Sequence, residues 1–241
     1  MRLITNFESS VSLQAQHNAH YLFYSRTTPA SYMPDHVFQM ALAIRMRTIP
    51  RKCLTTPKVC RCGATCRDAE EIMDHVLRCD QMTHYTHTNR HNDVRDAIAQ
   101  VVRSYGISVS SEPKFYSAFY EGPSEQRPDL TFHTTPKITT DVTIVSTTDK
   151  VGDAAAAAAQ HKCRTHAQAT AALGHIFMPF AMEVHGHLDK SCYDLQKKLQ
   201  EFIPDHLKRD FKFDFLHAVS SSLAAARATA VICAMSTGSI V

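Results

Sequence analysis

The stretch that most constrains the fold runs from Arg127 to Lys162. Two short runs of β-branched and aromatic residues occur in it, Thr131-Phe132 and Val142 to Val145, with a polar, proline-containing step at Thr134 to Lys137 between them. Residues of the first kind favour strands and the step favours a turn. The stretch therefore predicts a β-hairpin of two short strands. An alanine-rich segment that carries Lys162 follows, and its composition predicts a helix.

An acidic residue stands before each predicted strand, Asp129 before the first and Asp141 before the second. A hairpin of this length brings both carboxylates to one end of the sheet. Two carboxylates that lie close together repel each other unless a cation bridges them, and Mg²⁺ prefers such oxygen ligands. The pair therefore predicts a magnesium site of the kind used to cleave phosphodiesters. The alternative interpretation is a surface hairpin with two solvated acids.

A second candidate metal site lies in a segment of twenty residues that contains four cysteines and a histidine. Asp68 and Glu71 have the spacing of a capping box, which predicts a helix that begins there. His75 and Cys79 then lie one turn apart on the same face of that helix. With the preceding Cys-x-Cys-Gly turn they offer four ligands for one tetrahedral Zn²⁺: Cys60, Cys62, His75 and Cys79. Because the protein fills all four positions, we predict a structural zinc site, with Cys66 as a competing ligand.

The rest of the sequence predicts further helices and two further strands. The expected elements are a helix from Pro34-Asp35, a helix from Asn89 to Gly106, an aromatic strand over 115–120, the alanine-rich helix from Asp149 or Asp153 to Gly174, a strand over 175–184 interrupted at Pro179, and helices over 189–202 and 207–234. Strands that alternate with helices in this way are typical of an α/β protein.

Composition narrows the class of protein further. The chain has 241 residues, 44% of them hydrophobic, which supports a proper core. We divide it into a poorly structured segment (1–35), a helix with a zinc knuckle (36–88) and an α/β domain (89–241). The net charge of +3, with 15 histidines in addition, is compatible with a nucleic-acid partner. No uninterrupted apolar run reaches the roughly 20 residues of a membrane span, so we expect no membrane partner.

The order of these motifs resembles the C-terminal region of site-specific non-LTR retrotransposon proteins. In that family a zinc knuckle precedes a restriction-like endonuclease of the PD-(D/E)XK class. The resemblance covers about residues 36 to 235. It is carried by the knuckle and by Arg90-His91-Asn92, Glu112-Pro113, Arg127-Pro128-Asp129, Asp141-Val142-Thr143, Lys162 and Phe177 to Gly186.

The resemblance implies a restriction-endonuclease-like mixed sheet flanked by helices, preceded by the CCHC zinc knuckle. It implies a Mg²⁺-dependent nuclease that nicks target DNA so that a reverse transcriptase can prime from the free 3′ end. DNA, and in addition the element's RNA, are the implied partners, and the nucleus is the implied location. The chain has no Phe/Tyr-x-Asp-Asp polymerase signature, so we do not expect it to reverse-transcribe.

Individual roles also follow from the resemblance. Asp129 and Asp141 match the two acids that hold Mg²⁺. Lys162 matches the basic residue on the following helix, since Thr143 stands where a lysine is usual. Thr165 and His166 stand where the family has a second basic residue and a tyrosine. The residues expected to face nucleic acid are Arg90, His91 and Arg127. Whether Glu112 or Glu183 adds a metal ligand stays open from the sequence.

Two other functions compete with the nuclease. In the first, the knuckle and the basic helices hold DNA or RNA and the carboxylate site is vestigial. In the second, the chain is an inert remnant folded around zinc. The presence of Asp129, Asp141 and Lys162 favours the nuclease, whereas Thr165 and His166 favour the alternatives.

Overall fold

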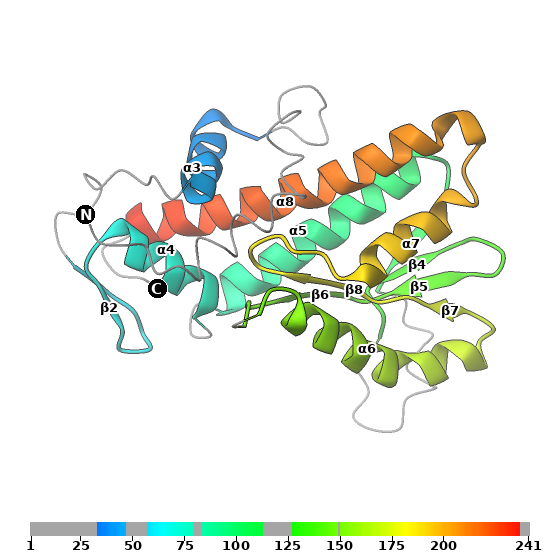
Figure 1. The fold of residues 1–241 in the computed structure, drawn as a ribbon, viewed down its shortest axis with the longest axis horizontal. Coiled ribbons are helices and arrows are strands. Elements are labelled where there is room, and N and C mark those ends of the chain that lie inside the picture. Colours follow the sequence, from blue (N-terminus) through cyan, green and yellow to red (C-terminus); the bar gives the residue numbers. More distant parts are fainter. Residues whose placement is uncertain (1–32, 47–56, 80–82, 113–126, 149, 237–241) are drawn as a thin grey trace.

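The computed structural model describes residues 33–46, 57–79, 83–112, 127–148 and 150–236. Nearly all of the predicted N-terminal segment and the whole predicted aromatic strand over 115–120 lie outside the described residues. Within them the chain is a mixed α/β protein, with a sheet flanked by helices and a cysteine/histidine cluster before it (Figure 1). The predicted fold class is therefore confirmed at this level.

The sheet is mixed and is continued by a parallel pair of strands. Its order is β3-β4-β5-β7, with antiparallel pairing except between β5 and β7, and β6 pairs in parallel with β8. The bounds are Val109–Ser111 (β3), Leu130–Phe132 (β4), Ile138–Thr140 (β5), Val142–Val145 (β6), Ile176–Phe177 (β7) and Phe180–Glu183 (β8). The amide of Phe180 donates to the carbonyl of Asp141 at 3.0 Å, which joins the two parallel ladders.

The hairpin differs from its prediction in the identity of its second strand. β4 pairs with β5, whose Ile138 lies opposite Phe132, and not with the predicted Val142 to Val145. A turn pairs the residues next to it, and Ile138 is itself β-branched and fully buried. The predicted strand forms β6 instead and runs parallel to β8. Parallel strands need a crossover connection, and the helix between β6 and β8 supplies it.

Helices cover both faces of the sheet (Figure 1). α5 (Thr83–Ser104), α7 (Lys190–Gln200) and α8 (Lys208–Ser236, after a 3₁₀ turn at Asp205–Leu207) pack on one face around the main hydrophobic core, and α6 (Asp153–Ala172) covers the other. α6 packs on the strands through small buried residues such as Ala155 and Ala169, as its composition predicted.

Two helix starts differ from the prediction. α5 begins at Thr83, well before Asn89. The N-cap of α6 is Gly152, with a φ of 92° and no side-chain cap, so the predicted cap by Asp153 is wrong; Asp149 lies outside the described residues. The carboxylate of Glu183 accepts a hydrogen bond from the amide of Gly152 at 2.7 Å. A buried carboxylate from β8 thus takes the favourable place at the N-terminus of the helix.

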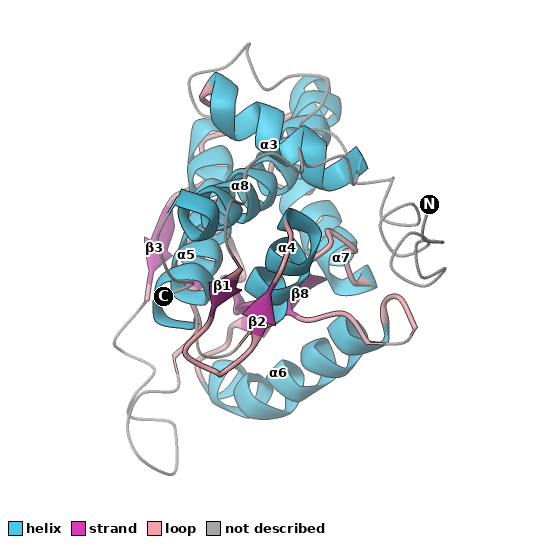
Figure 2. Ribbon diagram, turned by 90° about the vertical axis from the view of Figure 1, so that its left-hand side faces the viewer, coloured by secondary structure: helices cyan, strands magenta, loops and turns pink. Residues whose placement is uncertain are grey.

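A second hydrophobic cluster holds the N-terminal elements against the far half of α8. α3 (Asp35–Met46), β1 (Lys58–Val59), β2 (Thr65–Cys66) and α4 (Ala69–Arg78) bury side chains such as Ile44 and Ile72 against Ala224, Ala228 and Val231. Figure 2 shows β1, β2 and α4 gathered beside that end of α8. The alanines let the elements approach closely. The predicted domain boundary at residues 88 and 89 stays a prediction.

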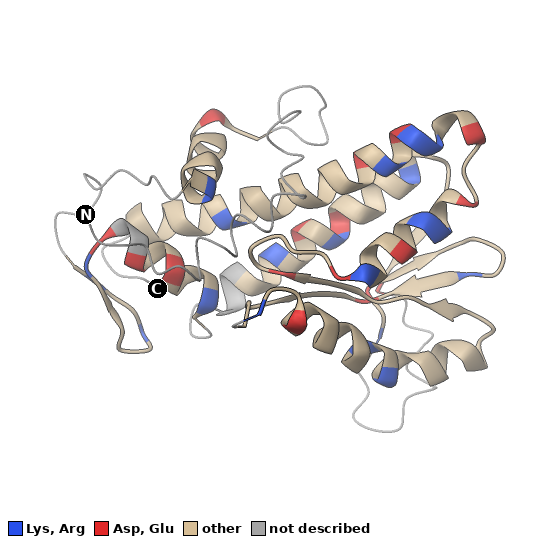
Figure 3. Cartoon of the chain, viewed as in Figure 1, with Lys and Arg blue, Asp and Glu red and all other residues tan. Residues whose placement is uncertain are grey.

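The stretch Asp205–Ser236, which includes α8, is long and apolar enough to span a membrane by length and composition alone. This was not predicted from the sequence, because charged residues interrupt the stretch. Half of its most apolar 18-residue segment is buried inside the protein. Its charges gather near its start, and beyond Asp214 it carries only Arg227 (Figure 3). A helix buried on several sides by its own chain is typical of a protein core.

We expect Phe180→Ala to destabilise the protein by about 3–5 kcal/mol, because the ring is fully buried and its removal leaves a cavity beside Phe215. Leu42→Ala on the exposed face of α3 is the control and should change stability by less than about 0.5 kcal/mol. Chemical denaturation measures both, and equal effects would contradict this assignment of the core.

Candidate functional site

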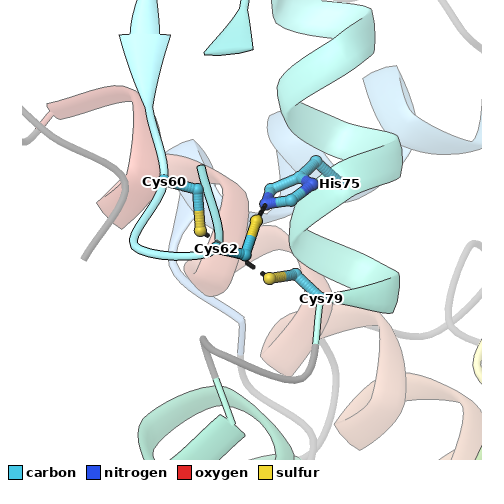
Figure 4. A group of neighbouring side chains, drawn as sticks. All are labelled: Cys60, Cys62, His75 and Cys79. Atoms are coloured by element: carbon cyan, nitrogen blue, oxygen red, sulfur yellow. Dashed lines mark hydrogen bonds between the residues drawn. The ribbon is translucent and has the colours of Figure 1, made fainter. Parts of the chain in front are cut away.

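The first candidate site is the cysteine/histidine cluster between the β1–β2 hairpin and α4 (Figure 4). Cys60 and Cys62 lie in the turn of the hairpin, where Gly63 has a φ of 89° and donates its amide to the carbonyl of Cys60. α4 is capped by Asp68, whose carboxylate accepts from the amide of Glu71 at 2.9 Å, as the capping box predicted. The helix then places the other two ligands, His75 and Cys79, across from the turn.

The distances in the cluster fit one tetrahedral zinc ion. The Sγ atoms of Cys60 and Cys79 are 3.7 Å apart, and the Sγ of Cys62 is 3.5 Å from the Nε2 of His75. At usual zinc–ligand lengths, tetrahedral geometry places two sulfurs about 3.8 Å apart and a sulfur and a nitrogen about 3.5 Å apart. Burial raises the pKa of Cys60 to about 11. A cation at the centre opposes that effect because it stabilises the thiolate.

Cys66 does not belong to this group. It lies on β2, paired with Lys58, and its side chain is buried in the second hydrophobic cluster. The ligand atoms that lie within 4.8 Å of one another come from the four predicted residues. The distances between ligand atoms thus decide the competition and leave Cys66 outside the group.

We expect Cys62→Ser to weaken zinc binding at least about tenfold, because it removes a ligand that the other three cannot replace. Chelator competition on the purified chain measures the affinity. Cys233→Ser, at an exposed cysteine on α8, is the matched control and should bind zinc as the wild type does. Unchanged zinc affinity in Cys62→Ser would show that the cluster is not a zinc site.

The second candidate site lies where β4 begins and β5 ends. Leu130 pairs with Thr140, so their neighbours Asp129 and Asp141 face each other across the antiparallel ladder. α5 adds His91. One ligand atom from each of these three residues lies within 4.8 Å of the others, and Asp141 is buried. Such a group of carboxylates and an imidazole is able to hold a divalent cation.

Each carboxylate has its own set of partners. The Oδ2 of Asp129 accepts hydrogen bonds from the Nε2 of His91 at 3.0 Å and from the amide of Val142 at 2.7 Å. The Oδ2 of Asp141 accepts from the Nζ of Lys162 at 2.9 Å and contacts the Nε2 of His166 at 2.5 Å. The side chains of α5 and α6 thus meet the two carboxylates where β4 begins and β5 ends.

The pKa values of Asp129 and Asp141 are shifted in opposite directions. Burial raises the pKa of Asp129, and the hydrogen bond from His91 only partly offsets this. Burial opposes the charge on Asp141 too, but hydrogen bonds from His166 and Asp129 and the charge of Lys162 lower its pKa to about 2. Asp141 therefore carries the charge of the pair at low pH. Two facing carboxylates whose pKa values diverge in this way are typical of a coupled site.

Sequence reasoning did not assign a function to His166. Its ring is 2% exposed, contacts Asp141 and packs 5.1 Å from the ring of Phe177. His166 lies four residues after Lys162 on α6, and this spacing places two side chains on the same face of a helix. This spacing is the feature of the sequence that indicates that His166 lies beside Lys162 at the site.

The other predicted site residues lie further out. Arg127 lines the cleft and pairs with Glu112 at 2.8 Å, and Glu112 also binds Arg95. Arg90 is 4% exposed, lies beside Arg227 of α8 and does not line the cleft, and its predicted contact with nucleic acid stays a prediction. The carboxylate of Glu183 accepts the hydrogen bond from the amide of Gly152 at the N-terminus of α6. Among the described residues neither glutamate joins the group of three metal-ligating side chains.

A cleft of about 630 Å³ opens over the three residues. His87 and His91 line it from α5, Thr143 from β6, and His161, Lys162 and Thr165 from α6. The walls are polar and mostly basic or neutral, and the two carboxylates lie at the base. This arrangement suits an anionic substrate that meets a cation held by the acids.

No protein-family model matches the sequence, and a search of curated proteins finds no significant match. The function of the chain is therefore inferred from the geometry of the two candidate metal sites.

Proposed function

We propose that the chain is a Mg²⁺-dependent DNA endonuclease derived from a non-LTR retroelement, which nicks target DNA. The observation that carries the proposal is the facing pair Asp129 and Asp141, with Lys162 on an oxygen of the second acid, at the base of an open cleft. The antiparallel strands that carry the pair and the helix that carries Lys162 occur in the order that the resemblance to restriction-like endonucleases implies.

Each residue has a role in this reaction. Asp129 and Asp141 would hold the cation, which would acidify a bound water molecule and stabilise the charge on the phosphate. Lys162 exchanges its contact with Asp141 for the phosphate or the attacking water, as a point charge on a flexible stem. His166 keeps Asp141 ionised and fixes its orientation while Lys162 moves.

The surroundings of the pair fit a phosphodiester substrate. Arg127 stands at the rim of the cleft with its side chain 41% exposed, where it is able to contact a DNA strand. The zinc cluster has a structural role. Such a protein acts on chromosomal DNA, so we assign it to the nucleus, with the element's RNA as a further partner.

A second function, nucleic-acid binding without cleavage, is favoured by one observation. The two carboxylates already have cationic or hydrogen-bonding partners within the chain, namely His91, Lys162 and His166. A site satisfied in this way is stable without a metal ion. In that case binding persists and its logarithm falls linearly with the logarithm of salt concentration.

A plasmid assay separates these functions. We expect the zinc-loaded chain to nick supercoiled plasmid with Mg²⁺ and not with EDTA. Asp129→Ala and Lys162→Met should each lower the rate at least about 100-fold, because each removes a group that stabilises the reacting phosphate.

Asp153→Asn is the matched control. It removes an acid that is 57% exposed in the first turn of α6, outside the cleft, and should cleave at the wild-type rate. Cleavage that survives Asp129→Ala would point to a contaminating nuclease and sink the proposal. Salt-sensitive binding without any nicking would establish the second function instead.

A further inference from the structure

The carboxylate site contains a nitrogen ligand, and this bears on which metal ion it selects. Its three ligand atoms come from Asp129, Asp141 and His91. The Nε2 of His91 is 3.0 Å from the Oδ2 of Asp129. Two ligands at about 2.1 Å from one octahedral ion, in adjacent positions, also lie about 3.0 Å apart. His91 is therefore placed where a metal bound by Asp129 is able to reach it.

The ring of His91 is held in an orientation that suits ligation. Its Nδ1 lies 3.3 Å from the side-chain oxygen of Asn92. An amide oxygen only accepts, so this contact assigns a proton to Nδ1. Without a metal ion Nε2 also carries a proton, which it donates to Asp129. A cation held by the acids would take the place of that proton and bind the lone pair of Nε2. Metal-ligating histidines usually have such an outer partner for the second nitrogen. The helix itself is fixed in the core by Val94 and Ile98, both fully buried.

The acids alone offer few oxygens to a metal. The Oδ2 of Asp141 is engaged by Lys162 and His166, and the Oδ2 of Asp129 accepts from the amide of Val142. A cation here thus completes its coordination with His91 and water. Mg²⁺ accepts imidazole poorly and retains oxygen ligands, whereas Mn²⁺ accepts carboxylate, water and imidazole together.

We propose that His91 is the third metal ligand of this site and that the site consequently selects Mn²⁺ over Mg²⁺. This inference rests on the proposed nuclease function and refines it: Mg²⁺ supports the reaction, and Mn²⁺ binds to the same site more tightly. It gives His91 a role at the metal in place of a contact with nucleic acid.

The test measures metal binding directly. The zinc-loaded full chain is titrated with Mn²⁺, and electron paramagnetic resonance follows the signal of free Mn²⁺; Mg²⁺ is then added as a competitor. We expect Mn²⁺ to bind at least about tenfold more tightly than Mg²⁺, and His91→Asn to weaken Mn²⁺ binding at least about tenfold. His91→Asp, which replaces the nitrogen by a carboxylate oxygen, should reduce the preference for Mn²⁺.

The matched control is His161→Asn, because His161 lines the same cleft but does not belong to the group of ligands. It should bind Mn²⁺ as the wild type does. Thermal unfolding and zinc content confirm that each variant is folded. Mn²⁺ affinity that is unchanged in a folded His91→Asn protein, or equal affinity of the wild type for the two ions, would overturn the inference.

The outcome is separable from that of the plasmid assay. Mn²⁺ bound through His91 without any nicking supports the ligand set and refutes the nuclease. Nicking that depends on Asp129 while Mn²⁺ affinity is indifferent to His91 supports the nuclease and refutes the role of His91.

Discussion

The packing of α8 is the interaction on which the rest of the structure depends. Its first half buries Phe211 and Phe215 in the core beneath the sheet, and its second half buries Ala224 and Ala228 against α3 and the elements of the cysteine/histidine cluster. Burial of apolar surface is the dominant favourable term in folding, and one helix supplies it to both clusters. The cysteine/histidine cluster and the sheet are separate in sequence, yet α8 packs against the elements of both and holds them in one arrangement.

Electrostatic repulsion between the two carboxylates of the candidate catalytic site opposes folding. Asp129 and Asp141 face each other in a partly dehydrated position, where two negative charges repel strongly. The structure reduces this cost with Lys162 and His166 on one acid and His91 on the other. A metal ion would relieve the same repulsion from the centre. The elements that carry these partners, α5 and α6, lie on opposite faces of the sheet, so cationic groups from both layers converge where β4 begins and β5 ends.

Local patterns in the sequence predicted the two sites with unequal success. The four residues of the candidate zinc cluster come from a short segment, and the capping box of Asp68 set the helix that carries two of them. The pair Asp129 and Asp141 was predicted because one hairpin contains both. His166 was not assigned a function, since its contact with Asp141 depends on how α6 crosses the sheet. Arg90 was predicted to face nucleic acid, but the α5–α8 interface buries it, and helix periodicity alone does not say which face meets a partner.

The sequence by itself determined what depends on neighbours along the chain: the helix of the knuckle, the turn between Thr134 and Lys137, and the α/β class. Only the tertiary structure decided which strand completes the hairpin, because Ile138 to Thr140 and Val142 to Val145 are equally suited to β structure and the choice between them is made by pairing with β4 and β8. It also decided that Glu183 accepts a hydrogen bond at the N-terminus of α6, whereas His91 forms a hydrogen bond with Asp129. Those contacts join residues about 30 to 40 positions apart, and their energies come from burial and charge in the assembled fold, which no local pattern encodes.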